Sequence, residues 1–165
     1  INILIKSFEK LSQKYKFLRL FIVGHKESDY GRKIEGIAKD SSVGLKIHFT
    51  GKVYKVLDYY SIADIFVLPT IKKGEGCPVS LLEAMACDIS PIASNVSGIK
   101  DVLDPFPDLL FFPGNTNSLA EKLENLIVAK EHKKNIYRNY ISKNYDINIE
   151  VNNHMKIYKN LLGMN

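Results

Sequence analysis

The sequence has few cysteines and no long apolar run, and each shortage argues against a class of protein. Its two cysteines, Cys77 and Cys87, are too few for a disulfide framework and lack metal-ligand spacing. They indicate a reducing compartment. The longest apolar run, LRLFIVG at 18–24, is far too short to span a bilayer, and no signal peptide opens the sequence. We therefore expect neither a disulfide-stapled fold nor a membrane span in these residues.

The sequence also lacks a strong excess of charge of one sign. Lysine and arginine number 23 against 18 acidic residues, so the net charge is +5. The lysines are spread along the chain and form no basic stripe interleaved with aromatic residues, which argues against a nucleic-acid partner. A solvated surface is the simpler interpretation of this charge, and a surface for an anionic partner is the alternative.

What is present is the composition of an ordinary globular domain. Apolar residues make up 45% and charged residues 25% of the 165 residues, which suits one domain with a real core. We find no internal repeat, low-complexity stretch or linker, so residues 1–165 are predicted to form a single domain. The chain starts at Ile1 rather than Met, already in a helical pattern. We expect it to be an N-terminally truncated piece of a longer protein.

Apolar periodicity predicts strands that alternate with helices. Strands are expected at 17–24, 45–51, 64–70, 90–95 and 109–112. Helices are expected at 1–15, 29–41, 55–63 and 98–104, and from Thr116 onward. The tyrosines of the helix at 55–63 are interpreted as packing residues. This alternation is typical of βαβ units, so the predicted fold class is α/β: a Rossmann-like, doubly wound parallel sheet with helices on both faces and further helices at the C-terminus.

The segment EGCPVSLLEAMACDISPIAS, which starts at Glu75, follows the expected strand at 64–70. In a doubly wound sheet, ligands bind at the carboxyl ends of the strands. Pro78 suits the first position of a helix, where its missing N–H costs nothing. The amides of residues 79–81 would then face outward beside the positive end of the helix dipole, and Gly76 would allow close backbone approach. This segment therefore predicts an anion site for a phosphate or diphosphate.

Two carboxylates flank that predicted anion site. Glu83 falls on the helix face opposite the core residues Leu81, Leu82 and Met85, where it could accept two hydrogen bonds from a ribose diol. Glu75 precedes the helix and would lie beyond the phosphates, near whatever they carry. A nucleotide sugar has a ribose at one end of its diphosphate and a sugar at the other. One carboxylate near each end would therefore suit such a ligand. The alternative is that Glu83 is an ordinary solvated residue and that Glu75 merely complements the helix dipole.

These residues resemble the Glu–seven residues–Glu signature of retaining glycosyltransferases of group 1 (family 4), which have the GT-B fold. The resemblance covers essentially the whole chain. The segments LRLFIVG, KIHFTGKV, YYSIADIFVLPT, ASNVSGIKDVL and LLFFPGNTNSLAEKL fall where that family's C-terminal, donor-binding domain places them. The resemblance implies a hexosyltransferase-type enzyme that moves a sugar from a nucleotide diphosphate to a glycan or lipid-linked acceptor, with retention at the anomeric carbon.

The resemblance also implies roles for single residues. Glu75 is expected to be catalytic and to act on the donor sugar, while Glu83 is expected to hold the ribose hydroxyls. The remaining donor-binding positions are Gly76, Cys77, Pro78 and Val79 around the diphosphate, Val53 at the base, and Ser97 and Gly98 close to the donor. Neither a cofactor nor a metal is expected, because the nucleotide-diphosphate sugar is itself the donor substrate.

The sequence departs from the family pattern in three ways. Cys77-Pro78 replaces an aromatic-glycine pair, which removes one amide donor, and Asp88 stands where a glycine usually provides a left-handed helix cap. The strand and the basic segment that the resemblance places before Ile1 are not among these residues, and neither is the acceptor-binding N-terminal domain. We expect the fragment alone to be inactive, and the full-length protein to be cytoplasmic, with peripheral association at the inner membrane face as an option. A nucleotide-sugar epimerase of the same fold and a binding module without turnover are the alternatives.

The missing strand makes a prediction about strand pairing. In the order 3-2-1-4-5-6 the first strand is central, and here no residues precede Ile1 to fill it. We therefore expect 17–23 to pair with 47–50 and 64–68 to pair with 90–93. Between 17–23 and 64–68 we expect a gap of two strand spacings, roughly 9–10 Å, unless a partner chain fills it. The open edges of the isolated fragment would promote aggregation.

Overall fold

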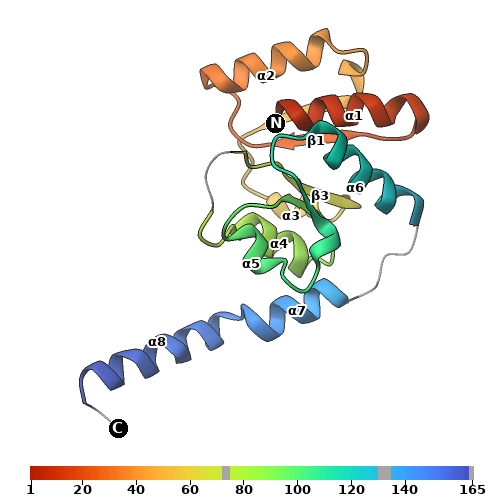
Figure 1. The fold of residues 1–165 in the computed structure, drawn as a ribbon. Coiled ribbons are helices and arrows are strands. Elements are labelled where there is room, and N and C mark those ends of the chain that lie inside the picture. Colours follow the sequence, from red (N-terminus) through yellow and green to blue (C-terminus); the bar gives the residue numbers. More distant parts are fainter. Residues whose placement is uncertain (72–74, 130–134, 164–165) are drawn as a thin grey trace.

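A computed structural model describes residues 1–71, 75–129 and 135–163 of the chain (Figure 1). The strands are β1 Leu20–Val23, β2 Ile47–Gly51, β3 Ile65–Leu68, β4 Ser90–Ser94 and β5 Leu110–Phe111. The helices are α1 Asn2–Lys14, α2 Asp29–Asp40, α3 Val56–Tyr60, α4 Val79–Ala86, α5 Ile99–Val102, α6 Thr116–Ala129, α7 Ile136–Asn144 and α8 Ile147–Leu161. Two 3₁₀ turns, η1 Gly44–Lys46 and η2 Pro107–Leu109, precede β2 and β5. The predicted alternation of strands and helices is confirmed.

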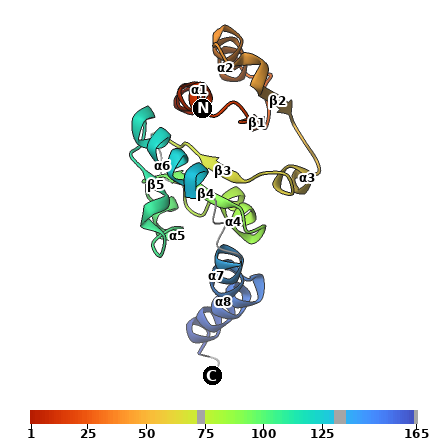
Figure 2. The same cartoon turned by 90° about the vertical axis from the view of Figure 1, so that its right-hand side faces the viewer.

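The strands of the described residues form two parallel sheets rather than one. β1 pairs with β2, with Leu20 opposite Ile47. β3, β4 and β5 form the other sheet, in which Ile65 lies opposite Ser90. Within the described ranges no ladder joins β1 to β3, and Figure 2 shows β1 and β2 beside α2 while β4 and β5 lie beside α5. Both predicted pairings, and the missing ladder between them, are therefore confirmed; the width of the gap stays a prediction.

Helices cover both faces of the sheet that contains β4. Successive side chains of a strand point to opposite faces. Ile92 of β4 packs with Leu4 of α1 and Leu119 of α6 on one face. Ala93, the next residue, packs with Met85 of α4 and Ile99 of α5 on the other. This is the doubly wound arrangement that the apolar strands predict.

Helix α1 contributes to two separate apolar cores. Its residues Ile3, Leu4 and Leu11 belong to the cluster formed with β4, β5 and α6. Its residues Ile5 and Phe8 belong to a second cluster, formed with α2 and β2. The helix therefore lies between the two sheets and packs against both.

Polar contacts also join α1 to α6. The buried Ser7 hydroxyl lies 2.8 Å from the carbonyl oxygen of Thr116. Glu124 Oε1 accepts hydrogen bonds from Lys14 Nζ at 2.6 Å and from the Tyr15 hydroxyl at 3.0 Å. These two donors hold the pKa of Glu124 below its usual value, with the Lys14 hydrogen bond as the largest cause.

Helix α4 ends in a left-handed cap even though the capping residue is an aspartate. Asp88 has φ 62°. Its N–H donates to the carbonyl of Met85 at 2.9 Å, and the N–H of Ile89 donates to the carbonyl of Ala84 at 3.0 Å. These two bonds form a Schellman motif. Aspartate therefore fills the position in which the family usually has glycine.

The Asp88 side chain explains why aspartate is favourable at this position. Its carboxylate accepts hydrogen bonds from the backbone amides of Asn135 and Arg138, at the start of α7. Arg138 Nε in turn donates to the carbonyl of Ala86 at 2.9 Å. A negative charge at a helix N-terminus is favourable, so the residue that ends α4 also caps α7.

Helix α8 extends away from the rest of the chain (Figure 1). None of its residues is buried, although it carries apolar side chains such as Val151 and Ile157, which are 52% and 54% exposed. Asp146 caps its start by accepting from the amide of Asn148 at 2.8 Å. In the described part of the chain, no helix combines the length and the hydropathy needed to cross a membrane.

Candidate functional site

The carboxyl ends of β3 and β4 bring Glu75 and Ser97 together. After β3, the hydroxyl of Thr70 donates to Glu75 Oε1 at 2.6 Å. After β4, the carbonyl of Ser97 accepts from the amide of Glu75 at 3.1 Å. The predicted catalytic carboxylate is therefore fixed by its backbone to one strand end and by its side chain to the other, and it remains partly exposed.

Gly98 permits this close approach between the two loops. It is buried and has φ 81°, a conformation that disfavours side chains. A Cβ atom there would lie 1.3 Å from the carbonyl oxygen of Glu75 and 2.7 Å from that of Gly76. The amide of Gly98 donates to the carboxylate of Asp101 at 3.0 Å, which fixes the start of α5. The predicted donor-site residue Gly98 thus has a structural role in holding Glu75.

The start of α4 differs by one residue from the prediction. Pro78 was expected at the first helical position, but it has ψ 103° and is the N-cap, so α4 begins at Val79. Because an N-cap carbonyl accepts the first helical hydrogen bond, the amide of Leu81 donates to Pro78 at 3.0 Å. Leu81 was therefore wrongly expected to offer an outward amide. The amides of Val79 and Ser80 remain as first-turn donors without a helix carbonyl to bond.

The residues before Pro78 are open to solvent. Gly76 and Cys77 are exposed, and a Cβ atom on Gly76 would meet no atom of the described residues within 4 Å. Packing against these residues therefore does not require glycine at 76. The prediction that a ligand approaches the Gly76 backbone closely stays a prediction.

Glu83 is exposed on α4, as predicted, and is held by a residue that the sequence did not mark as functional. The hydroxyl of Tyr60, at the end of α3, lies 3.1 Å from Glu83 Oε2. Only 8% of Tyr60 is exposed, and its ring packs with Ala84 and Ile89. Burial, followed by the charge of Glu83, raises the pKa of Tyr60. The interpretation of Tyr60 as a packing residue is confirmed, but its hydrogen bond to Glu83 was not predicted.

Two further predicted residues lie at the same edge of the fold. Val53 follows β2 in the loop that leads into α3, and it is partly buried. Ser97 is exposed in the loop between β4 and α5. The carboxyl ends of β2, β3 and β4 thus carry all the predicted donor-site residues, apart from those in α4 itself.

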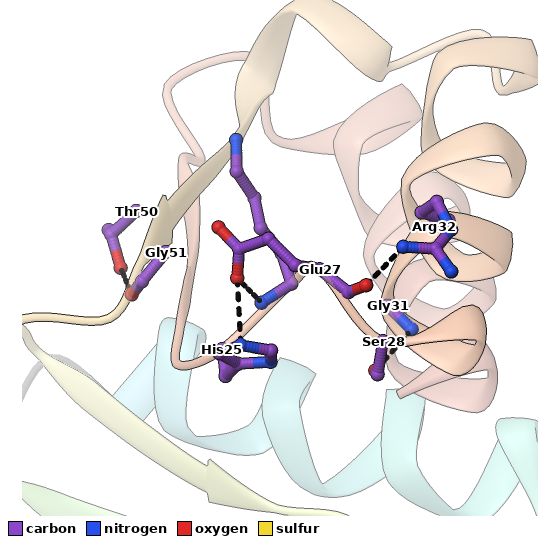
Figure 3. A network of polar contacts seen from close by, with 8 residues as sticks. His25, Glu27, Ser28, Gly31, Arg32, Thr50 and Gly51 are labelled. Carbon is purple, nitrogen blue, oxygen red and sulfur yellow. Dashed lines mark hydrogen bonds and ion pairs between the residues drawn. The ribbon is translucent and has the colours of Figure 1, made fainter.

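The loop after β1 carries an exposed polar network (Figure 3). The amide of Gly24 donates to Gly51 at the end of β2, at 3.1 Å. His25 Nε2 lies 3.1 Å from Glu27 Oε2, and both side chains are 63% exposed. Exposed ion pairs contribute little to stability, so we assign His25 a surface role.

A cavity among the described residues lies at the opposite edge of the sheet. It measures about 540 Å³ and is lined by residues that include Tyr60, Asp64, Asp88, Ile89 and Arg138. Asp64 precedes β3 and Ile89 precedes β4, so the cavity lies at the amino ends of these strands. Ligands of doubly wound sheets bind at the carboxyl ends, and the glutamates Glu75 and Glu83 do not line this cavity. Among the described residues, no group of acidic, histidine or cysteine side chains could hold a metal ion.

Comparison with known proteins identifies the family. The pattern described as "Glycosyl transferases group 1" matches residues 1–143. The N,N'-diacetylbacillosaminyl-diphospho-undecaprenol alpha-1,3-N-acetylgalactosaminyltransferase of Campylobacter jejuni is 29% identical over 119 residues, which cover 70% of this chain and 31% of that protein. This chain therefore spans about a third of that relative.

Solved structures share the fold. A glycosyltransferase of Rickettsia africae has a TM-score of 0.88 at 20% identity, over 97% of this chain and 44% of that one. The HepE protein of Anabaena, solved in complex with UDP, has a TM-score of 0.80 at 18% identity, over 98% of this chain and 44% of that one. The predicted α/β fold class is confirmed. The family match over most of the sequence, on this fold, shows that the chain belongs to the group 1 glycosyl transferases and corresponds to their C-terminal domain.

Proposed function

We propose that this chain binds a nucleoside diphosphate sugar at the carboxyl ends of β2, β3 and β4 and supports retaining transfer of the sugar. The observation that carries the proposal is the placement of two carboxylates around the start of α4. Glu75 lies before the helix and accepts from Thr70, while Glu83 lies within it and accepts from Tyr60. Between them are the amides of the first helical turn, which favour an anion.

Each part of the donor has a matching group at this site. The diphosphate would lie at the amides of Val79 and Ser80, with the backbone of Gly76 and Cys77 beside it. The ribose hydroxyls would donate to Glu83, and the base would contact the backbone of Val53. The UDP complex of HepE, a protein of the same fold, supports a nucleoside diphosphate as the ligand.

In the reaction we propose, Glu75 faces the donor sugar. The bond between the anomeric carbon and the diphosphate oxygen breaks, and the electron pair leaves with the nucleoside diphosphate. The acceptor hydroxyl forms the new bond on the same face of the sugar and passes its proton to the departing diphosphate oxygen. Glu75, beside Ser97 and Gly98, would stabilise the positive charge that develops on the sugar.

The acceptor and the cellular setting are proposed from relatives rather than from this chain. The Campylobacter relative acts on an undecaprenol-linked sugar, which supports a lipid-linked or glycan acceptor and a cytoplasmic protein at the membrane surface. Because the chain covers only 31% of that relative, acceptor binding would involve residues outside this sequence. We therefore expect the 165 residues alone to bind the donor without transferring the sugar, and no metal or cofactor is proposed.

Nucleotide titration tests the proposal. The change is Glu83→Ala, and UDP and GDP are titrated into wild type and variant by calorimetry. Binding of the preferred nucleotide is expected to weaken by about 1–3 kcal/mol, the range for losing a charged hydrogen-bond partner. Glu121→Ala is the control, because Glu121 is an exposed glutamate on α6.

Unchanged affinity in Glu83→Ala would contradict the ribose assignment. Two alternative functions keep the same fold, and the epimerase would use other catalytic residues. A binding module would show nucleotide-sugar binding without transfer in the protein that carries this chain, and an epimerase would convert the donor sugar without any acceptor.

A further inference from the structure

The hydroxyl of Tyr60 lies within hydrogen-bond distance of two acceptors on α4. Glu83 Oε2 is 3.1 Å away and the carbonyl oxygen of Ser80 is 3.3 Å away. A phenol has one proton to donate, and a carboxylate is a stronger acceptor than a carbonyl. The proton is therefore directed to Glu83. The raised pKa of Tyr60, caused first by burial and then by the charge of Glu83, keeps that proton on the phenol.

The Tyr60 ring is fixed, whereas the Glu83 side chain by itself is not. The ring is buried among Ala84, Ile89 and the partly buried Phe66, whose ring meets it edge-on with centroids 6.3 Å apart. Glu83 is exposed and has three rotatable bonds, so in isolation it would sample many rotamers. A hydrogen bond from a fixed donor selects one orientation of the carboxylate.

We propose that Tyr60 is a positioning residue that orients the Glu83 carboxylate toward the ribose of the donor. The inference rests on the proposed donor site. Tyr60 occupies one lone pair of Oε2, and the second lone pair of Oε2 together with Oε1 remains for the two ribose hydroxyls. Tyr60 also ends α3, whose preceding loop carries Val53. The residue therefore links the segment proposed to contact the base with the carboxylate proposed to bind the ribose.

The test compares ribose and dideoxyribose nucleotides in Tyr60→Phe. Phenylalanine keeps the buried ring and removes the hydroxyl. UDP and GDP, and their 2′,3′-dideoxy forms, are titrated into the purified protein. For the preferred base, the dissociation constant of the ribonucleotide is expected to rise about two- to tenfold, the range for one lost hydrogen bond. The dissociation constant of the dideoxynucleotide, which has no diol for Glu83, is expected to stay unchanged.

Tyr59→Phe is the matched control, since Tyr59 is the neighbouring tyrosine of α3 and its ring packs against Phe21 instead. The double variant Tyr60→Phe with Glu83→Ala is expected to bind ribonucleotide no more weakly than Glu83→Ala alone, because both changes remove the same contact. An additive loss in the double variant would overturn the inference.

Two other results would also overturn it. One is an equal loss for ribo- and dideoxynucleotide in Tyr60→Phe, which would mean that Tyr60 only supports the fold. The other is unchanged ribonucleotide binding in Tyr60→Phe while Glu83→Ala still weakens it, which would leave the proposed function intact. If Glu83→Ala itself does not change the preference for ribonucleotide, the donor-site proposal fails together with the inference.

Discussion

The backbones of Gly98 and Glu75 are in contact so close that any side chain on Gly98 would overlap the Glu75 carbonyl oxygen, which lies 1.3 Å from the position of an added Cβ atom. Gly98→Ala therefore has to separate the two loops or shift Gly98 from its φ of 81°. We expect the free energy of unfolding to fall by about 1–3 kcal/mol, the cost of a strained backbone position. Urea unfolding measures this change.

Gly76→Ala is the matched control for Gly98→Ala. A Cβ atom at 76 meets no atom of residues 1–71, 75–129 and 135–163 within 4 Å, so the free energy of unfolding is expected to change little. If the backbone of Gly76 approaches the diphosphate as proposed, this variant weakens nucleotide binding without loss of stability. Equal destabilisation by both variants would contradict the structural role given to Gly98.

Glu75→Gln separates the roles of the two glutamates. Glutamine keeps an oxygen that can accept from Thr70, which now donates to Glu75 at 2.6 Å, but it loses the charge. We expect turnover of the full-length enzyme to fall at least about tenfold, since a group that acts on the transition state changes kcat. Affinity for the free nucleoside diphosphate is expected to stay nearly constant. A parallel fall in that affinity would mean that Glu75 is a binding residue.

Asp88 connects the end of α4 to the start of α7. Its alanine and glycine variants should therefore differ in stability in a defined order. Asp88→Ala loses the cap on α7 and leaves alanine at φ 62°. We expect a loss of roughly 1–3 kcal/mol in the free energy of unfolding, from cap loss and left-handed strain. Asp88→Gly loses the cap but relieves the strain, so its loss should be smaller. Thermal unfolding of both variants checks the order, and a glycine variant less stable than the alanine variant would refute it.

The contact between α1 and α6 predicts a pH-dependent contribution to stability. Lys14 and Tyr15 lower the pKa of Glu124 in the folded state below the ordinary value of 4.5. The folded state then binds fewer protons than the unfolded state, so the contribution is present above pH 4.5 and is lost as the pH falls through the folded pKa. Wild type should be more stable than Glu124→Gln at pH 7 and should lose that advantage below pH 4.5.

The control for this pH dependence is Glu121→Gln, on the same helix. The ion pairs recorded for the described residues do not include Glu121, so its replacement is expected to leave the pH dependence of unfolding as in wild type. Added salt should reduce the loss of stability that Glu124→Gln causes at pH 7. Lys14 is 66% exposed, so salt screens its charge.

The sequence predicted the fold, the place of Glu75 before α4 and the exposure of Glu83 on α4, because all three depend on local patterns. Apolar runs and helical periods predicted the strands within a few residues; for example, β3 occupies Ile65–Leu68 inside the expected 64–70. Pro78 was misplaced by one position because a proline suits both the N-cap and the first turn, and only the backbone angle decides.

Contacts between residues far apart in the sequence were not predictable in the same way. Tyr60 and Glu83 are 23 residues apart, and Asp88 and Asn135 are 47 apart. Helical spacing indicates that Tyr60 packs, but it does not say where its hydroxyl points. For Asp88, the family pattern indicated only that a glycine is missing at the end of α4. The aspartate is favourable there because it caps α7, which begins far along the chain.

Helix α1 has a consequence for how the molecule unfolds. Within the described residues, the β1–β2 sheet and the β3–β4–β5 sheet share no backbone ladder. Cooperative unfolding of the two sheets therefore depends on side-chain packing between them. Helix α1 provides much of that contact, with Leu4 in one core and Phe8 in the other, and the partly buried Leu20 of β1 packs against both cores. We therefore expect the two halves to melt as one cooperative unit while α1 stays docked. If α1 is released, hydrogen exchange should divide into two independent regions.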